Sequence, residues 1–332
     1  MRQLSKGIGP AICLALTLAA QAPVPRADPP ASDAAKKTEG PATFTADTRL
    51  VVLPVSVSDK SGKLVTNLAR QSFKVYENGA EQAIKIFRRE DVPISLGIII
   101  DNSGSMREKR HKVETASLDL VKASNPQDEV FVVNFNDEAY LDVPFTNEIK
   151  KLEDGVARID SRGGTAMRDA ISMSIDYVKD KGKKDKKVLL VVTDGNDTAS
   201  SGTLEKLIDK ARDREVLIYA IGLLNEEERR EGKKAKRALD AITRESGGLS
   251  FYPKEVSEVD KIALQVAQDI RNQYTIAYSP TIQALDGSFR QIKVVVNGAG
   301  HSTVRTRTGY YASPAADSTK KAASLTTSGL SK

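Results

Sequence analysis

Three oxygen-bearing side chains follow a predicted buried strand within five residues, in the sequence Asp-Asn-Ser-Gly-Ser at 101–105. Asp101, Ser103 and Ser105 are residue types that hard divalent cations such as Mg²⁺ accept as ligands, because these cations prefer oxygen. Gly104 lets the backbone turn tightly between them. Taken alone, the same residues also suit a polar turn with a helix cap, since Asp and Ser favour both. The pattern therefore needs support from other segments.

Two further segments supply oxygen ligands of the same kind. A glycine-rich turn, Gly163-Gly164-Thr165, offers one more hydroxyl. The mostly apolar run 188–193 predicts a second buried strand, and it ends in the carboxylate of Asp194. In open α/β sheets, ligands bind beyond the carboxyl ends of the strands, so the two strand ends are expected to meet at one edge. The predicted metal ligands, some of them acting through water, are Asp101, Ser103, Ser105, Thr165 and Asp194.

Residues 91–271 alternate between predicted strands and predicted helices. The run 94–100 is short, rich in Ile and without polar alternation, which is typical of a parallel strand covered on both faces. The alternation predicts an α/β domain with a doubly wound, mostly parallel sheet, and Pro144 favours an edge position for its strand. Strands are expected at 94–101, 129–135, 140–145, 187–194, 216–222 and 249–252, and helices at 108–122, 148–159, 167–178, 204–214, 235–246 and 256–270.

The segments 44–90 and 272–312 have short alternating strands and tight turns instead. Asn78-Gly79 lies between apolar runs and predicts a two-residue hairpin, because both residues tolerate a positive φ. The first segment is too small to bury much surface, so it needs partner strands. We hypothesise that both segments form one antiparallel β-sandwich into which the α/β domain is inserted. Its strands are expected at 50–58, 73–76, 83–87, 273–278, 290–296 and 304–308.

The first 22 residues have the pattern of a secretory signal. Arg2 and Lys6 precede the apolar stretch 8–20, and Ala-Gln-Ala ends at residue 22. An uncleaved membrane anchor is the alternative, although the stretch is short for a span. We expect an exported protein, periplasmic, on the cell surface or extracellular, with no integral membrane span after cleavage. The single Cys, Cys13, lies in this segment, so no disulfide is expected in the mature protein.

Outside the folded segments and the signal, the composition is that of flexible chain. Residues 23–43 are predicted to be a disordered linker and residues 313–332 a disordered tail, because both are poor in large apolar residues. The chain has 50 basic and 44 acidic residues, a net charge of +6, and only 5% aromatic residues, which gives no sign of a nucleic-acid partner.

Two charge runs lie near opposite edges of the predicted sheet. The run 179–187 precedes a strand, so we expect a solvated loop at the edge away from the metal site. The run 226–237 follows a strand and belongs to the metal-site edge. There it could steer a ligand, or it could be an exposed helix stabilised by opposite charges four residues apart.

The oxygen-bearing segments, in their order along the chain, resemble the metal-ion-dependent adhesion site of the von Willebrand factor type A family: Asp-x-Ser-x-Ser, then Thr, then Thr-Asp-Gly. The flanking Val-x-Glu-Asn-Gly and Arg-Thr-Gly-Tyr sequences resemble those of bacterial secreted proteins with a variant of this domain. The resemblance implies a non-enzymatic adhesion module. Its Mg²⁺, or alternatively Mn²⁺ or Ca²⁺, would bind an Asp or Glu side chain of a protein partner. In related architectures the last helix, here 256–270, shifts when ligand binds.

Two other classes of protein remain as alternatives. A metal-dependent hydrolase would use the ion to activate water. The only histidines, His111 and His301, fall in a predicted helix and a hairpin turn, and the chain has no Gly-x-Ser-x-Gly sequence and no P-loop. A structural envelope protein would use the metal only to stabilise a loop. Asp197 is close enough in sequence to support the site indirectly, or it is a surface turn residue.

Overall fold

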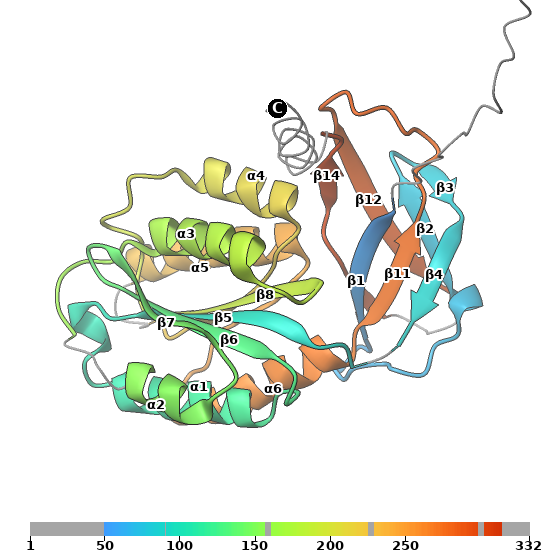
Figure 1. Ribbon diagram of the computed structural model, residues 1–332. Helices are drawn as coiled ribbons and strands as arrows, with labels where there is room; N and C mark the ends of the chain where they lie inside the picture. Colours follow the sequence, from blue (N-terminus) through green and yellow to red (C-terminus); the bar gives the residue numbers. More distant parts are fainter. Residues whose placement is uncertain (1–49, 90, 157–160, 225–228, 298–301, 314–332) are drawn as a thin grey trace, which may run out of the picture. The chain divides into compact units, whose positions relative to one another are not determined.

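The computed structural model describes residues 50–89, 91–156, 161–224, 229–297 and 302–313. In these residues three β-sheets are present, and helices pack on one of them (Figure 1). The predicted signal segment, the linker and the tail from residue 314 onward lie outside the described residues. Within the described residues, no helix has the length and apolar character needed to span a bilayer.

The helix-covered sheet has six strands in the described part of the chain, in the order β10-β9-β8-β5-β6-β7. All neighbours are parallel except β6 and β7, which pair in antiparallel fashion at one edge. This arrangement confirms the predicted α/β fold class. The strands are β5 (Ile94–Asp101), β6 (Glu129–Phe135), β7 (Ala139–Thr146), β8 (Lys186–Thr193), β9 (Leu217–Gly222) and β10 (Ser250–Phe251).

Helices cover both faces of this sheet (Figure 1). One face holds α1 (Arg110–Lys122), α2 (Ile149–Val156) and α6 (Val259–Arg271). The other face holds α3 (Met167–Lys181), α4 (Leu204–Arg214) and α5 (Arg229–Ser246). Every residue of β5 is buried as a result, which explains why this strand shows no polar alternation.

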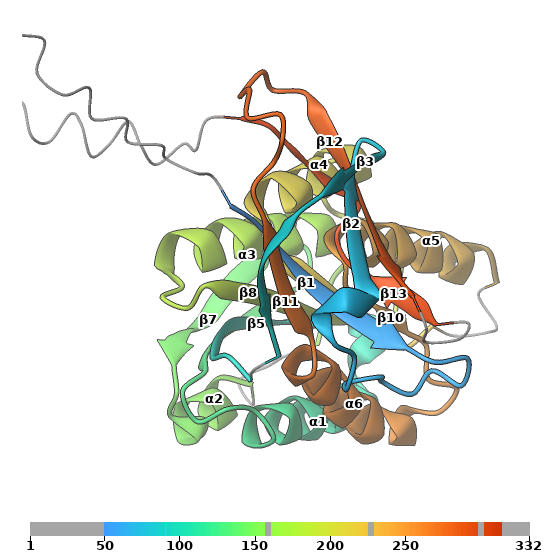
Figure 2. The same ribbon diagram turned by 90° about the vertical axis from the view of Figure 1, so that its right-hand side faces the viewer.

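The remaining strands form two antiparallel sheets, each with four strands in the described residues (Figure 2). One sheet contains β13 (Thr303–Arg305), β1 (Val51–Ser58), β11 (Tyr274–Tyr278) and β4 (Ile84–Arg88), in that order. The other contains β14 (Gly309–Tyr311), β12 (Phe289–Val296), β2 (Phe73–Glu77) and β3 (Ala80–Gln82). Their buried side chains share one apolar core, so the two sheets form a β-sandwich.

The sandwich combines strands from before and after the α/β domain. β1 and β4 both pair with β11, and β2 pairs with β12, so three N-terminal strands have partners in the C-terminal segment, whereas β3 pairs with β2. The predicted strand 83–87 corresponds to β4, and the structure adds the short strand β3 before it, in the other sheet. Gln82 and Ile84 are both buried, because the chain crosses from one sheet to the other between them. The exact limits of the proposed domains remain predictions.

Short 3₁₀ turns and one tight hairpin complete the connections. They are η1 (Arg70–Ser72), η2 (Gly104–Met106) and η3 (Val256–Glu258), the last of which leads directly into α6. Asn78 and Gly79 have φ values of 48° and 83° between β2 and β3, as the predicted two-residue hairpin requires.

A buried polar cluster joins the end of α6 to the sandwich. Asp269 in α6 accepts hydrogen bonds from the Arg305 guanidinium of β13 at 2.8 Å and from the Tyr219 hydroxyl of β9 at 2.6 Å. Gln273 donates to the Tyr219 hydroxyl at 3.1 Å and to the Ser56 hydroxyl of β1 at 3.0 Å. The cluster therefore connects the α/β sheet, its last helix and the sandwich through specific contacts.

Candidate metal centre

Asp101 and Thr193 are the last residues of the neighbouring parallel strands β5 and β8. The register pairs Ile100 with Val192, so the two following side chains lie next to each other. The Thr193 hydroxyl donates to Asp101 Oδ2 at 2.6 Å, and the backbone N–H of Ser103 donates to Asp101 Oδ1 at 2.8 Å. The Asp101 carboxylate is fully buried and held in one orientation.

Two serine hydroxyls connect Asp101 to the second predicted carboxylate. The hydroxyls of Ser103 and Ser105 are 3.2 Å apart, and the Ser105 hydroxyl donates to Asp194 Oδ1 at 2.8 Å. The 3₁₀ turn η2 carries Ser105 back toward the edge of the sheet. Four of the five predicted ligands thus form one continuous polar cluster at the carboxyl ends of β5 and β8.

Thr165 approaches the cluster from the turn before α3. A Cβ atom added to Gly195 would lie 3.9 Å from Thr165 Oγ1, so the threonine hydroxyl lies beside the turn that carries Asp194. The turn itself depends on Asp137, which accepts a hydrogen bond from the Gly164 N–H at 2.7 Å. Within the described residues, no hydrogen bond joins the Thr165 hydroxyl to the other four predicted ligands.

Burial raises the pKa of Asp101 to about 6, and the nearby negative charge of Asp194 acts in the same direction. Hydrogen bonds from Thr193 and Ser103 oppose this rise in pKa. Two buried carboxylates so close together are costly unless a positive charge compensates them. Such a pair therefore fits a divalent cation.

The chemistry of the donor set points to a hard cation. Within the described residues, no three His, Cys, Asp or Glu side chains converge, so hydroxyl and water oxygens must complete the coordination. A donor set made only of oxygen suits Mg²⁺, Mn²⁺ or Ca²⁺. The residues present therefore fit the predicted ion.

Lys109 and Asp137 are parts of the site that the sequence pattern did not identify. The Lys109 ammonium donates to Asp194 Oδ2 at 2.5 Å, so a cationic group already contacts one predicted ligand. Asp137 could have been noticed, because it closely follows β6 at the same edge of the sheet. No sequence signal marks Lys109, which is one of several charged residues before α1.

Asp197 does not contact the predicted ligands in the described structure. Its carboxylate accepts hydrogen bonds from the backbone N–H of Arg168 at 2.7 Å and from its guanidinium at 3.0 Å, near the start of α3. It also accepts from the Ser200 hydroxyl at 2.7 Å. Asp197 therefore fixes the loop after Asp194 to α3 and supports the site only through the backbone.

The two charge runs differ in part from their predictions. The run 179–187 includes the end of α3 and the start of β8, and Lys186 donates to the backbone carbonyl of Ile270 at 2.5 Å, so it is not simply a solvated loop. In the other run, residues from 229 onward belong to α5. Glu231 accepts a hydrogen bond from the Asn196 side chain at 2.9 Å, which places the start of α5 beside the Asp194 turn.

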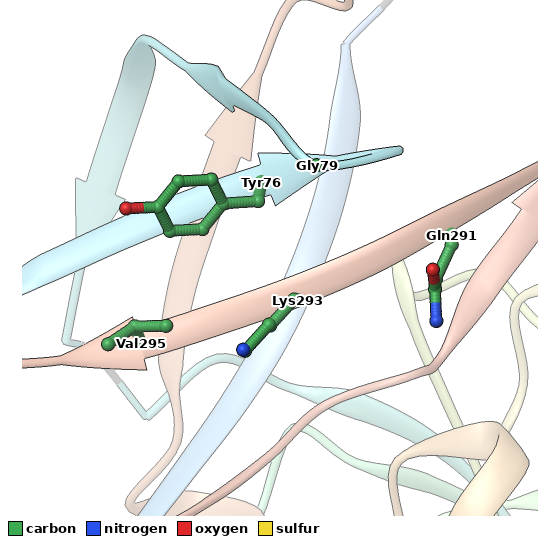
Figure 3. A pocket seen from close by; sticks show the side chains of 5 residues that line it. All are labelled: Tyr76, Gly79, Gln291, Lys293 and Val295. Carbon is green, nitrogen blue, oxygen red and sulfur yellow. The ribbon is translucent and has the colours of Figure 1, made fainter.

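Among the described residues, His111 and the hollow on the sandwich do not form a second candidate site. The side chain of His111 is 90% exposed on α1, and His301 lies outside the described residues. A hollow of about 540 Å³ lies on the outer face of the sandwich (Figure 3). One charged side chain lines it, and it has no cluster of titratable groups; the lining residues are Tyr76, Gly79, Gln291, Lys293 and Val295.

The fold and the polar edge of its sheet define a class of protein. The profile of the von Willebrand factor type A domain matches residues 96–265, and the chain belongs to this family. The family consists of adhesion and protein-interaction modules. A comparison with curated proteins finds no match.

Solved structures with this fold are similar to the chain at low identity. The von Willebrand factor type A protein from Catenulispora acidiphila is 14% identical, with a TM-score of 0.47. The match covers 70% of this chain and 71% of the Catenulispora chain. An aerotolerance-related membrane protein from Bacteroides fragilis is 17% identical, with a TM-score of 0.44, over 53% of this chain and 98% of its own. Proximal thread matrix protein 1 from the mussel byssus, described with a zinc-occupied adhesion-site motif, is 17% identical, with a TM-score of 0.48, over 59% of this chain and 50% of its own.

Proposed function

We propose that this protein is an exported adhesion module that uses a divalent cation to capture an acidic side chain of a protein partner. The observation that carries the proposal is the cluster of two carboxylates and two serine hydroxyls at one edge of the sheet. Export is supported by the charged, apolar and Ala-x-Ala segments at the start of the sequence.

The charge of the cluster favours a third, external carboxylate. Asp101 and Asp194 supply two negative charges, which match the two positive charges of the ion. The remaining protein ligands are neutral hydroxyls, which donate electron density weakly. The ion therefore stays electrophilic enough to accept an Asp or Glu from a partner. Mg²⁺ is our first choice, and Mn²⁺ and Ca²⁺ are alternatives that also prefer oxygen.

The first test is calorimetric titration of Mg²⁺ and of Mn²⁺ into residues 23–332. We expect saturable binding of one ion, and we expect Asp101→Asn to abolish it, because the amide keeps the size of the side chain and removes its charge. Asp128→Asn is the matched control, since Asp128 is also a buried carboxylate but hydrogen-bonds Ile94 at the opposite edge of the sheet. Equal ion affinity in Asp101→Asn and the wild type would refute the metal centre.

The second test concerns the partner. A protein partner captured in Mg²⁺ should be released by EDTA and should not bind Asp101→Asn. A partner that stays bound in EDTA would favour the structural scaffold over the ion-dependent module.

A further inference from the structure

In this structure, Lys109 forms an ion pair with Asp194, one of the predicted metal ligands. It lies between η2 and α1, and its backbone N–H donates to the carbonyl of Met106 at 2.9 Å, which fixes the start of the side chain. Its ammonium donates to Asp194 Oδ2 at 2.5 Å, while Ser105 donates to Oδ1. Both oxygens of this carboxylate are therefore engaged.

The surroundings make this ion pair stronger than an ordinary surface pair. The Asp194 side chain is 1% exposed and the Lys109 side chain 25% exposed, so water screens the attraction only partly. A divalent cation ligated by Asp194 would compete with the ammonium for the same carboxylate and would repel it. Metal binding is therefore expected to weaken the Lys109–Asp194 contact.

We propose that the Lys109 ammonium changes its ion-pair partner when the metal binds, from Asp194 to the carboxylate of the protein partner. In the metal-free protein its ammonium neutralises Asp194 and competes with the ion. In the metal-bound protein the displaced ammonium lies at the rim of the centre, where an incoming Asp or Glu provides a new counter-charge. This inference rests on the proposed metal-dependent capture of a carboxylate, and it makes ion binding and partner binding cooperative.

The exchange predicts two effects of opposite sign for Lys109→Met. Mg²⁺ affinity, measured by calorimetry, should rise about tenfold, because a partly buried competing ion pair is removed. At saturating Mg²⁺, the affinity for a labelled Gly/Ser peptide with one Glu should fall about threefold or more, because one counter-charge of the carboxylate is lost. A residue with a purely structural role would not change the two affinities in opposite directions.

Three further variants make the test specific. Lys112→Met removes the same charge three residues further on, in α1, where Lys112 contacts Asp260 at 3.9 Å, so both affinities should stay within twofold of the wild type. Lys109→Arg retains a cation, so both affinities should change less than in the neutral variants. Lys109→Gln provides a second neutral variant if the methionine variant folds poorly.

The proposal and the proposed function fail in different ways. Rising Mg²⁺ affinity together with falling peptide affinity supports the exchange, and any other combination in both neutral variants overturns it. A wild-type protein that does not bind Mg²⁺, or that binds the Glu peptide and its Gln counterpart equally, refutes the metal-dependent capture itself.

Discussion

The ammonium of Lys186 lies at the amino end of β8, at the edge of the sheet opposite the candidate metal centre. Burial lowers the pKa of Lys186 to about 8, although Asp269, Asp91 and Asp128 favour its charged form. In the unfolded chain the pKa of this lysine is near its ordinary value of 10.5. Below pH 8 both states carry the charge, and the cost of burying it is fully present.

This lowered pKa predicts how stability changes with pH. Between about pH 8 and 10.5 the folded lysine loses its proton while the unfolded lysine keeps it, so the cost is relieved and the free energy of unfolding rises with pH relative to Lys186→Met. Urea unfolding of both proteins from pH 7 to pH 9.5 measures this difference. A constant difference across that range would show that Lys186 is not buried as a cation, and exposed Lys183→Met serves as the control.

At the same scale, residue types at strand ends made most of the candidate site predictable. Asp101 and Asp194 each follow a buried apolar run, and parallel strands bring such ends together. Lys109 was not predictable, because it lies in the turn before α1, where no strand register directs its side chain toward Asp194. The structure brings the predicted ligands together, and their binding of a metal remains a prediction.

Among the elements, the central strand β5 depends on a glycine. Gly97 faces Phe131 in β6 and Leu189 in β8, its register partners on either side. An added Cβ would lie 2.3 Å from the Phe131 ring and 2.6 Å from the Leu189 side chain. Neighbouring strands can therefore come together here only if position 97 has no side chain.

Gly97→Ala should lower the free energy of unfolding by about 1–3 kcal/mol, because both neighbours must move away from their packed positions. Denaturant unfolding measures the loss. Combining it with Phe131→Leu, which shortens the nearer side chain, should cost less than the sum of the two single changes. Simple additivity would mean that the strain is not located at this contact.

The elements also show where sequence patterns lose their power. β6 and α4 have the predicted limits, because their apolar periodicity begins and ends with the element. α5 begins at Arg229, whereas the predicted helix begins at residue 235. The prediction starts late because it follows buried apolar side chains, and Ala235 is the first of these in α5. Its first turns are stabilised by polar contacts such as the 2.8 Å pair between Lys234 and Glu231, which apolar periodicity does not reveal.

For the whole molecule, the contact between Asp269 and Arg305 joins the last helix of the α/β domain to the sandwich. Arg305→Met would leave the Asp269 carboxylate, whose side chain is only 4% exposed, without the guanidinium that hydrogen-bonds it. We expect the free energy of unfolding to fall by about 3 kcal/mol. Denaturant unfolding measures this fall.

The double variant Asp269→Asn with Arg305→Met should recover most of this stability, because the unpaired charge is removed. Failure of the double variant to recover would assign the loss to the packing of the Arg305 stem. Either outcome measures how firmly α6 is attached to its neighbour.

The insertion of the α/β domain into the sandwich determines how the molecule carries a mechanical load. The described chain begins beside β1 and ends beside β14, and both strands are hydrogen-bonded inside the sandwich. Because β1 and β14 lie in different sheets, tension applied between these two ends would cross the apolar core that the sheets share, away from the candidate metal centre. Tension applied through a partner at that centre would instead pass to the sandwich through the Asp269–Arg305 contact and the two chain crossings.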